Sequence, residues 1–316
     1  MNVVDLDSRF ENLKRAFRAS EEKLEKLAAL NDEYGSSGSC LIVNGSLARK
    51  ELVDGSDFDS FVVQAGRAEL ANELSRKAYE IAGLKEPGSS GIFGNDSTVL
   101  AEEMLRNIGG MSDSNEKITQ RMLLILESAA FGDMNIYNNL VDSMLARYIS
   151  DKITDHQLGL FLLNDVIRYY RTICVDFEFK TEEGRKPWGI RNIKLVFSRK
   201  LIYFSGLIIC AEMGQRTAAE KRSICRRLLS LTPIERMLVV LREDALEPLA
   251  YYDKFLEKMS DKDIREQLKS EDREKLRSSE LFRSLKNDGH HFTWALRSAF
   301  NRHYDSTHPI HKAIMF

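Results

Sequence analysis

The sequence lacks the features that mark several large classes of protein. It has four cysteines in 316 residues, and they stand far apart, without a CxxC pair or a nearby histidine, at Cys40, Cys174, Cys210 and Cys225. This spacing predicts buried, reduced thiols rather than a disulfide framework or a metal site. No apolar run approaches the roughly 20 residues of a membrane-spanning helix, and the N-terminus is too charged for a secretory signal. We therefore expect a soluble, cytoplasmic protein that does not act on a membrane.

Neither sign of charge is in excess, because the formal net charge is -2. The chain as a whole therefore has no electrostatic attraction to nucleic acid, and any polyanion must bind at a local basic patch.

A chain of 316 residues with 43% hydrophobic residues is long enough for two hydrophobic cores. No internal repeat is present, which excludes a solenoid, and no GxGxxG motif opens a helix, which argues against a Rossmann unit.

Hydrophobic periodicity in the first part of the chain predicts a small mixed β-sheet packed with helices. Residues 8–33 have the pattern of an amphipathic helix with Ser8 as its N-cap. A coiled-coil arm is the alternative interpretation of this segment. Short apolar runs at 40–44 and 58–63 predict buried strands, and a helix is expected at about 67–82.

The rest of the chain is predicted to be mostly helical, so we expect an α+β protein with a catalytic domain at residues 1–135 and a helical domain at 136–316. The glycine-rich passage at 83–110 is interpreted as a substrate-facing loop, with a plain connection as the alternative. The last residues hold three histidines, for which a polar, loosely ordered tail is favoured over a zinc site. Helices are expected at 113–126, 135–148, 158–177, 189–213 and within 217–260.

One stretch of sequence has the arrangement of residues that metal-dependent phosphate chemistry needs. Asp57 and Asp59 flank the apolar Phe58 at the start of a predicted strand. Alternate residues of a strand point to the same side, so two carboxylates would lie ~7 Å apart on one face. Such oxygen ligands suit a pair of Mg²⁺ ions that also bind substrate phosphates. A surface DxD that arises by chance is the alternative interpretation.

The preceding predicted strand ends in Gly45 and Ser46, which supply the other half of such a site. Glycine allows a phosphate to approach the backbone, and the serine hydroxyl and nearby amides can donate hydrogen bonds to it. The whole segment, from Gly45-Ser46 through Arg49 and Glu51 to Asp57 and Asp59, resembles the signature of the DNA polymerase beta-like nucleotidyltransferase superfamily, in the form seen in DUF294-type and uridylyltransferase-like domains.

This resemblance covers about 25 residues of the catalytic half. It implies that Asp57 and Asp59 bind two Mg²⁺ ions, with Mn²⁺ as an alternative, and that Gly45 and Ser46 bind the triphosphate of an NTP or dNTP. It also implies an ion pair between Arg49 and Glu51. The superfamily has a third carboxylate on a later strand, and four residues stand in the window for it, namely Asp96, Glu102, Glu103 and Asp113.

A basic stretch in the predicted helical domain fits the same chemistry. It contains six basic residues and no acidic one between Gly184 and Lys200, namely Arg185, Lys186, Arg191, Lys194, Arg199 and Lys200. On a helix, Arg191, Lys194 and Ser198 would share one face, and we expect Lys194 to bind substrate phosphates or an oligonucleotide. An ordinary basic helix surface is the alternative. Upstream, the polar residues Asp165, Arg168, Arg171 and Asp176 are expected to form buried ion pairs between helices.

These patterns predict a nucleotidyltransferase that moves a nucleoside monophosphate onto a hydroxyl acceptor and releases pyrophosphate. A nucleotide, an oligonucleotide, a tRNA end, a small molecule and a protein side chain, including the chain's own Tyr304, all stay open as acceptors, and so does a homo-oligomer. By analogy with members of the superfamily, a role in bacterial antiphage defence or a toxin-antitoxin system is expected. The alternatives are a catalytically inactive nucleotide- or nucleic-acid-binding regulator and an interaction scaffold.

Overall fold

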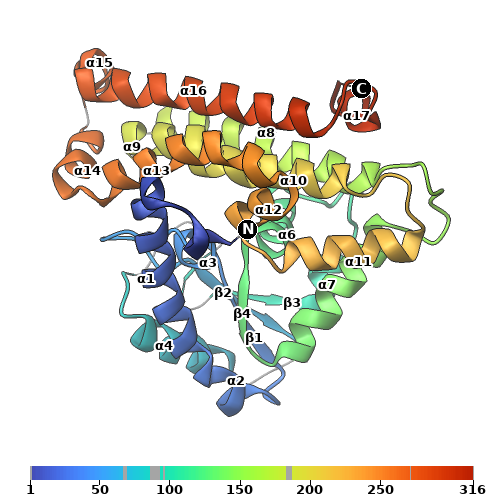
Figure 1. Ribbon diagram of the computed structural model, residues 1–316. Helices are drawn as coiled ribbons and strands as arrows, with labels where there is room; N and C mark the ends of the chain where they lie inside the picture. Colours follow the sequence, from blue (N-terminus) through green and yellow to red (C-terminus); the bar gives the residue numbers. More distant parts are fainter. Residues whose placement is uncertain are drawn as a thin grey trace.

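The computed structural model describes residues 2–66, 70–85, 93–94, 97–182, 187–270 and 272–315. A small β-sheet with its helices forms the lower part of the molecule in Figure 1, and a larger array of helices lies above it. The predicted fold class, α+β with a small mixed sheet and many helices, is confirmed, whereas the domain boundary at residue 135 stays a prediction.

The sheet has four strands in the described part of the chain, in the order β3-β2-β1-β4. Strand β1 pairs antiparallel with both β2 and β4, and β2 pairs parallel with β3. The strands are β1 (Ser39–Val43), β2 (Ser60–Gln64), β3 (Thr98–Leu100) and β4 (Ala129–Gly132).

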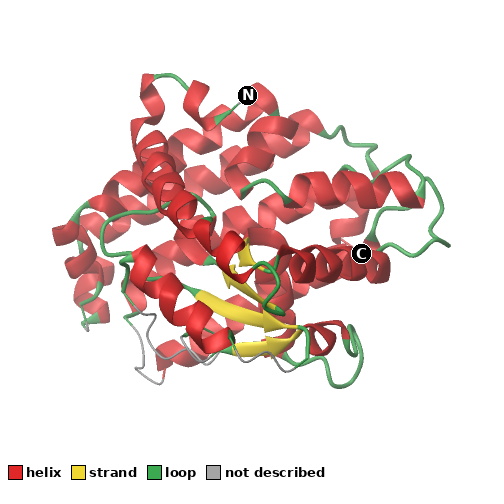
Figure 2. Ribbon diagram, turned by 90° about the horizontal axis from the view of Figure 1, so that it is seen from below, coloured by secondary structure: helices red, strands yellow, loops and turns green. Residues whose placement is uncertain are grey.

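Both faces of the sheet are covered by helices, as the view from below in Figure 2 shows. Alternate strand residues point to opposite faces. Leu41 and Val62 lie in a hydrophobic cluster with residues of α2 and α4, whereas Ile42 and Phe61 lie in a larger cluster that continues through the helical array. Helices α2 (Ala29–Tyr34), α4 (Ala71–Ala82) and α7 (Met134–Tyr148) contact the strands directly. Helix α1 (Glu11–Leu27) packs on α2 and α4, and α6 (Asn115–Glu127) leads into β4.

The helical array contains the longest helices, and α16 lies across its top in Figure 1. Its main helices are α8 (Leu160–Glu182), α9 (Trp188–Lys194), α10 (Lys200–Ala211), α11 (Ala218–Leu229), α12 (Pro233–Val240), α13 (Leu246–Ser260), α14 (Lys262–Leu268), α15 (Arg273–Ser278), α16 (Glu280–His303) and α17 (Pro309–Met315). The short elements are η1 (Val3–Asp5), η2 (Ser8–Phe10), α3 (Gly45–Ala48), α5 (Ala101–Leu105), the π turn η3 (Leu195–Arg199) and η4 (Arg242–Ala245).

Three predicted elements differ from the observed ones. The N-terminal helix is broken at Ala28 and preceded by a 3-10 turn, and its first cap is Asp7, whose carboxylate accepts from the Arg9 amide, rather than Ser8. Strand β2 begins at Ser60, so both aspartates precede it. The predicted helix 189–213 is interrupted by the π turn η3, which hydrophobic periodicity does not reveal.

The histidine-containing end is packed, so the prediction of a loosely ordered tail is wrong. The Tyr304 side chain is 4% exposed, and its hydroxyl donates to Glu212 at 2.9 Å. His311 Nε2 lies 2.9 Å from the Tyr304 carbonyl oxygen, and the rings of Phe300 and His308 contact Tyr304. This burial also makes Tyr304 a poor acceptor for self-modification. No group of three or more metal-ligating side chains occurs among the residues that the structure describes.

The four cysteines all lie within the described residues and form no disulfide. Cys40, Cys210 and Cys225 are buried as predicted, whereas Cys174 is half-buried. Burial raises the pKa of both Cys40 and Cys210 to about 12, so these thiols are protonated and inert. None of the described helices is long and apolar enough to span a membrane.

Candidate functional site

The turn after β1 brings Gly45 against Asp59. The Asn44 amide donates to the Asp59 carbonyl oxygen at 2.8 Å, which aligns the end of β1 with the residues before β2. Gly45 has a φ of +72°, and a Cβ added to it would lie 2.4 Å from Asp59 Oδ2. Only glycine fits here, because any side chain would displace the carboxylate.

Phe58 anchors the two aspartates. Its ring is fully buried and meets the ring of Tyr79 edge-on at 4.7 Å between centroids. Its amide donates to the Lys85 carbonyl oxygen at 2.8 Å, and its carbonyl oxygen accepts from the Tyr79 hydroxyl at 3.1 Å. The residues on either side of a buried residue in an extended segment point the other way. Asp57 and Asp59 therefore face a cavity between the sheet and the helical array.

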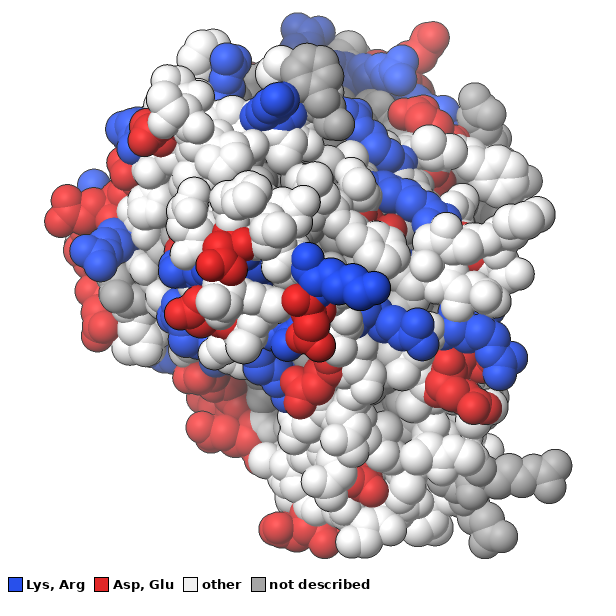
Figure 3. All heavy atoms as spheres, turned by 90° about the vertical axis from the view of Figure 1, so that its right-hand side faces the viewer, with Lys and Arg blue, Asp and Glu red and all other residues white. Residues whose placement is uncertain are grey.

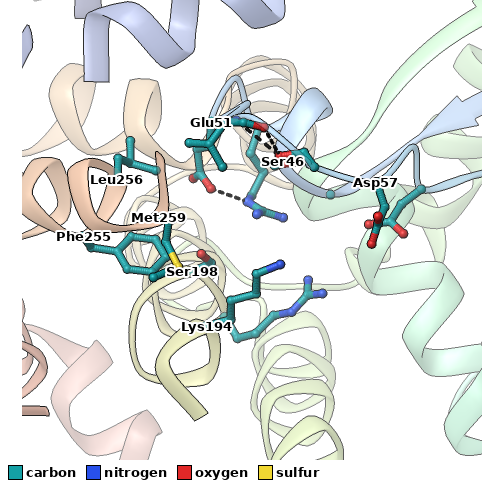
Figure 4. A pocket seen from close by; sticks show the side chains of 14 residues that line it. Ser46, Glu51, Asp57, Lys194, Ser198, Phe255, Leu256 and Met259 are labelled. Atoms are coloured by element: carbon teal, nitrogen blue, oxygen red, sulfur yellow. Dashed lines mark hydrogen bonds and ion pairs between the residues drawn. The ribbon is translucent and has the colours of Figure 1, made fainter. Parts of the chain in front are cut away.

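The cavity has an acidic end, a cationic middle and an apolar wall (Figure 4). Asp57 and Asp59 lie at the acidic end beside the Gly45–Ser46 turn, and the apolar wall comes from α13. The cavity volume of about 80 Å³ corresponds to about three water molecules. It is thus sized for an ion and a phosphate group, and is smaller than the several hundred Å³ of a typical ligand pocket. The wall residues on α13 are Phe255, Leu256 and Met259.

Two arginines at the cavity are held by buried carboxylates. Arg49 Nε lies 2.9 Å from Glu51 Oε2, so the predicted ion pair is confirmed, and Arg49 Nη1 lies 2.6 Å from Glu127 Oε2. Glu127 Oε1 also lies 3.4 Å from Arg199 Nη1. The side chain of Glu127, at the end of α6, is 1% exposed. It therefore links the turn after β1 to the helical array.

Lys194 is the cation at the cavity that has no partner. In the described part of the chain, its ammonium has no ion pair or hydrogen bond, although Asp57 and Asp59 lie close enough to interact with it electrostatically. Burial lowers the pKa of Lys194, and the charge of Arg199 lowers it further. The side chain is nonetheless exposed at the cavity, so its ammonium is accessible to a ligand there.

The π turn η3 sets which basic residues reach the cavity. A π turn holds about one residue more than an α-helical turn, so residues five apart share a side. Lys194 and Arg199 both line the cavity for this reason, together with Ser198. The predicted face was wrong for Arg191, which instead pairs with Asp176 at 3.6 Å.

The electrostatic environment of Asp59 is unfavourable for its charged form. Burial raises the pKa of Asp59, and the like charges of Glu127 and Asp57 act in the same direction. Arg199 and Lys194 oppose this shift without cancelling it. The neighbouring described cations therefore do not fully offset the cost of a negative charge on Asp59.

The structure brings together all five residues that the sequence singled out. Gly45, Ser46, Asp57, Asp59 and Lys194 line one cavity, although they come from segments far apart in the chain. The prediction that Asp57 and Asp59 flank an inward-facing Phe58 is also confirmed.

The third carboxylate is not found among the described candidates. Asp113 is buried against Arg121 and Arg168, Glu103 pairs with Arg106, and Glu102 is exposed, so none of the three lines the cavity. Asp96 lies outside the described residues, as do Arg185, Lys186 and most of residues 86–96 of the glycine-rich passage.

Several residues of the site were missed from sequence. Glu127 acts electrostatically on Asp59 and pairs with Arg49 and Arg199. Its one signal in the sequence is an acidic residue at the end of an apolar helix, shortly before a strand. Ser198 was expected to share a face with Lys194 and does line the cavity, whereas the apolar wall of α13 carried no distinguishing signal. Searches with the whole chain show that no protein-family model matches it and that no curated protein matches it significantly.

Proposed function

We propose that the protein is a metal-dependent nucleotidyltransferase, which moves a nucleoside monophosphate from an NTP or dNTP to a hydroxyl. The observation that carries this proposal is the meeting, at one cavity, of the Gly45–Ser46 turn, two adjacent carboxylates and the unpaired Lys194. The resemblance of residues 45–59 to the polymerase beta-like superfamily supports the same chemistry. In the reaction, the acceptor oxygen bonds to the α-phosphorus, the bond to the β-phosphate oxygen breaks, pyrophosphate leaves and the hydroxyl proton passes to water.

The side chains at the acidic end fit Mg²⁺, with Mn²⁺ as an alternative. Mg²⁺ binds through one or two carboxylates plus substrate phosphates and keeps several waters, and the oxygen-only pair of Asp57 and Asp59 suits this preference. The raised pKa of Asp59 also indicates a site in need of positive charge. When bound, the ions supply charge neutralisation at the attacking and leaving oxygens.

The protein's own groups would bind and orient the triphosphate. Gly45 leaves room for a phosphate beside the backbone, and the Ser46 hydroxyl can donate to it. The ammonium of Lys194 offsets the charge of the β- and γ-phosphates, because it has no ion pair with a carboxylate in the part of the chain that the structure describes. Arg49 and Arg199 are held in place by Glu127, so they need no reorganisation when substrate binds.

A second function, nucleotide binding without transfer, is favoured by one observation. Among the described residues, the only aspartates that line the cavity are Asp57 and Asp59, and Glu51 is already paired with Arg49. A protein that lacks the third carboxylate could bind Mg²⁺ and nucleotide and regulate a partner. The acceptor and a defence role stay predictions under either function.

Incubation of the purified protein with Mg²⁺ and each α-labelled NTP and dNTP tests the proposal. We expect label transfer and pyrophosphate release from one or more nucleotides, and loss of both in the double variant Asp57→Asn/Asp59→Asn. Asp54→Asn is the matched control, because this exposed aspartate lies in the same loop but outside the cavity.

Transfer that survives in the double variant would overturn the proposal. Nucleotide binding without pyrophosphate release would instead establish the second function. If no nucleotide binds, both functions are excluded.

A further inference from the structure

The basic residues between Gly184 and Lys200 that the structure describes do not all lie at the cavity. Arg199 lines the cavity, but Lys200, the next residue, does not. Neighbouring residues of a helix point about 100° apart. Lys200 lies instead where the start of α10 meets α8 and α16, and there it donates to Thr293 Oγ1 at 2.5 Å.

Lys200 and a second lysine, Lys286 on α16, are held only by neutral oxygens. Lys286 donates to Asn192 Oδ1 at 3.0 Å. Within the described ranges, neither ammonium has a carboxylate within ion-pair distance. Burial lowers the pKa of Lys200 to about 8, with a contribution from the positive charge of Lys286, and burial lowers the pKa of Lys286 as well. A half-buried cation without a counter-charge is unfavourable, and a bound anion would relieve that cost.

A third cation and an aromatic pair lie beside these lysines. Arg171 on α8 is exposed and acts electrostatically on Cys174 and Tyr203. Tyr170 and Tyr203 are half-buried and stack at 4.6 Å between centroids, with 13° between their planes.

The acids near this surface do not neutralise it. Glu178 on α8 lies close enough to affect Cys174, but it forms no ion pair with any of the three cations among the described residues. Asp176 on the same helix pairs with Arg191. On the face of the molecule that Figure 3 shows, Lys and Arg side chains lie interspersed with Asp and Glu. The positive charge at Arg171, Lys200 and Lys286 is therefore a local feature, which a protein of net charge -2 needs in order to bind a polyanion.

We propose that the surface formed by Arg171, Lys200 and Lys286 binds the phosphate groups of single-stranded nucleic acid. Three cations on three different helices suit successive phosphates of a strand better than one small anion. A stacked tyrosine pair beside them is the kind of ring surface on which bases stack without sequence preference. This inference does not depend on the proposed transfer reaction, because it concerns a surface outside the cavity.

Fluorescence anisotropy with labelled single-stranded RNA and DNA 20-mers of mixed sequence tests whether this surface binds nucleic acid. We expect the full-length protein to bind, and Lys200→Ala/Lys286→Ala to weaken binding of all sequences alike. Each lost phosphate contact reduces the slope of log K against log salt by about 0.7, so the double variant should lose about 1.4. Lys262→Ala/Lys312→Ala is the matched control, because these exposed lysines have the same charge and no ion pair among the described residues.

The inference is wrong if the unaltered protein does not bind the strand, or if the double variant and the control have equal salt slopes. It is also wrong if inorganic phosphate at constant ionic strength displaces the strand fully. The last result would identify a small anion as the ligand. Arg171→Ala guards against misfolding of the double variant, because Arg171 is exposed. It should reduce the slope by about 0.7 while circular dichroism stays unchanged.

Discussion

Two clusters of charged side chains in this protein are built in different ways. The helix cluster joins Asp113, Arg121, Tyr148, Asp165 and Arg168. Arg121 donates to both Asp113 oxygens at 3.0 and 2.9 Å, to Asp165 at 2.9 Å and to the Tyr148 hydroxyl at 2.7 Å. Arg168 completes it through Asp113 at 3.0 Å. Two positive and two negative charges balance, and each of them has a partner.

In the cavity cluster, by contrast, some charges have no partner among the described residues. It consists of Arg49, Glu51, Glu127 and Arg199, which pair with one another, together with Asp57, Asp59 and Lys194, which have no ion-pair partner among the described residues. The pKa of Asp59 is raised and that of Lys194 is lowered. These opposite shifts show that each group is less stable in its charged form here than in water.

The difference distinguishes a network in which every charge is paired from one that leaves charges open to a ligand. A closed network ties helices together, and removing one member leaves a buried charge unpaired. An open network keeps charges available for a ligand at some expense in stability, as active sites do. Stability and activity should therefore respond in opposite ways to substitutions in the two clusters.

The largest effect on stability is expected in the helix cluster. Arg121→Met leaves Asp113 and Asp165 without their main partner, so the free energy of unfolding should fall by about 3–5 kcal/mol. Urea denaturation measures this change. Arg147→Met on α7 is the control, because Arg147 is exposed and should change stability by less than about 0.5 kcal/mol. Equal effects of the two substitutions would remove the distinction between the clusters.

Lys194→Met should lower activity without lowering stability. It removes the unpaired cation at the cavity, so the transfer rate should fall by roughly 10²- to 10³-fold, as for the loss of one preorganised charge-stabilising group. The free energy of unfolding should not decrease, because no ion pair is lost. Pyrophosphate release and urea denaturation measure the two quantities. A loss of stability comparable to that of Arg121→Met would show that Lys194 is structural.

Gly45→Ala tests whether the position of Asp59 depends on the turn. An alanine at φ +72° costs about 1–2 kcal/mol of backbone strain. Gly83→Ala is the matched control, because Gly83 has a φ of +57° with nothing within 4 Å of an added Cβ. Both variants should lose similar stability, but only Gly45→Ala should lose Mg²⁺-dependent transfer. Retained transfer in Gly45→Ala would show that the carboxylate can move without consequence.

The smallest effect is a gain in stability. Because the folded pKa of Asp59 is raised, its contribution to stability is full below the unfolded pKa and is lost as the pH rises through the folded pKa. Asp59→Asn should therefore stabilise the metal-free protein by about 1 kcal/mol at neutral pH and not in acid. Thermal unfolding without Mg²⁺ at both pH values measures this. Destabilisation at neutral pH would mean that Asp59 is already neutralised within the protein.

The parts of the site that could be predicted are those encoded locally. Gly45, Ser46, Asp57 and Asp59 stand within one short stretch, where the alternation of side chains along an extended chain indicates which of them face together. The ion pair of Arg49 and Glu51 belongs to the same stretch. Asp165 pairs with Arg121, and Arg168 pairs with Asp113, as predicted for polar residues of an apolar helix. The same prediction was wrong for Arg171, which is exposed and forms no ion pair among the described residues.

The remaining parts depend on packing between distant segments. Glu127 meets Arg49 and Arg199 only because α6 ends at the same edge of the sheet where β1 ends. Polar composition predicted disorder near Tyr304, yet its ring packs on Phe300 and the chain there is folded. Helical spacing also predicted that Arg191 shares a face with Lys194 and Ser198, yet Arg191 pairs with Asp176 on α8 and does not line the cavity.

The π turn η3 also makes this part of the chain tolerant of one change in length. A π turn holds about one residue more than an α-helical turn, so deletion of one residue between 195 and 199 would leave an ordinary α-helix from α9 to α10. Lys194 and Arg199 would then stand four positions apart, the spacing at which side chains share one face of an α-helix. Both cations would stay at the cavity and Lys200 would stay outside it. The same deletion within α10 would instead rotate every later side chain by about 100° about the helix axis.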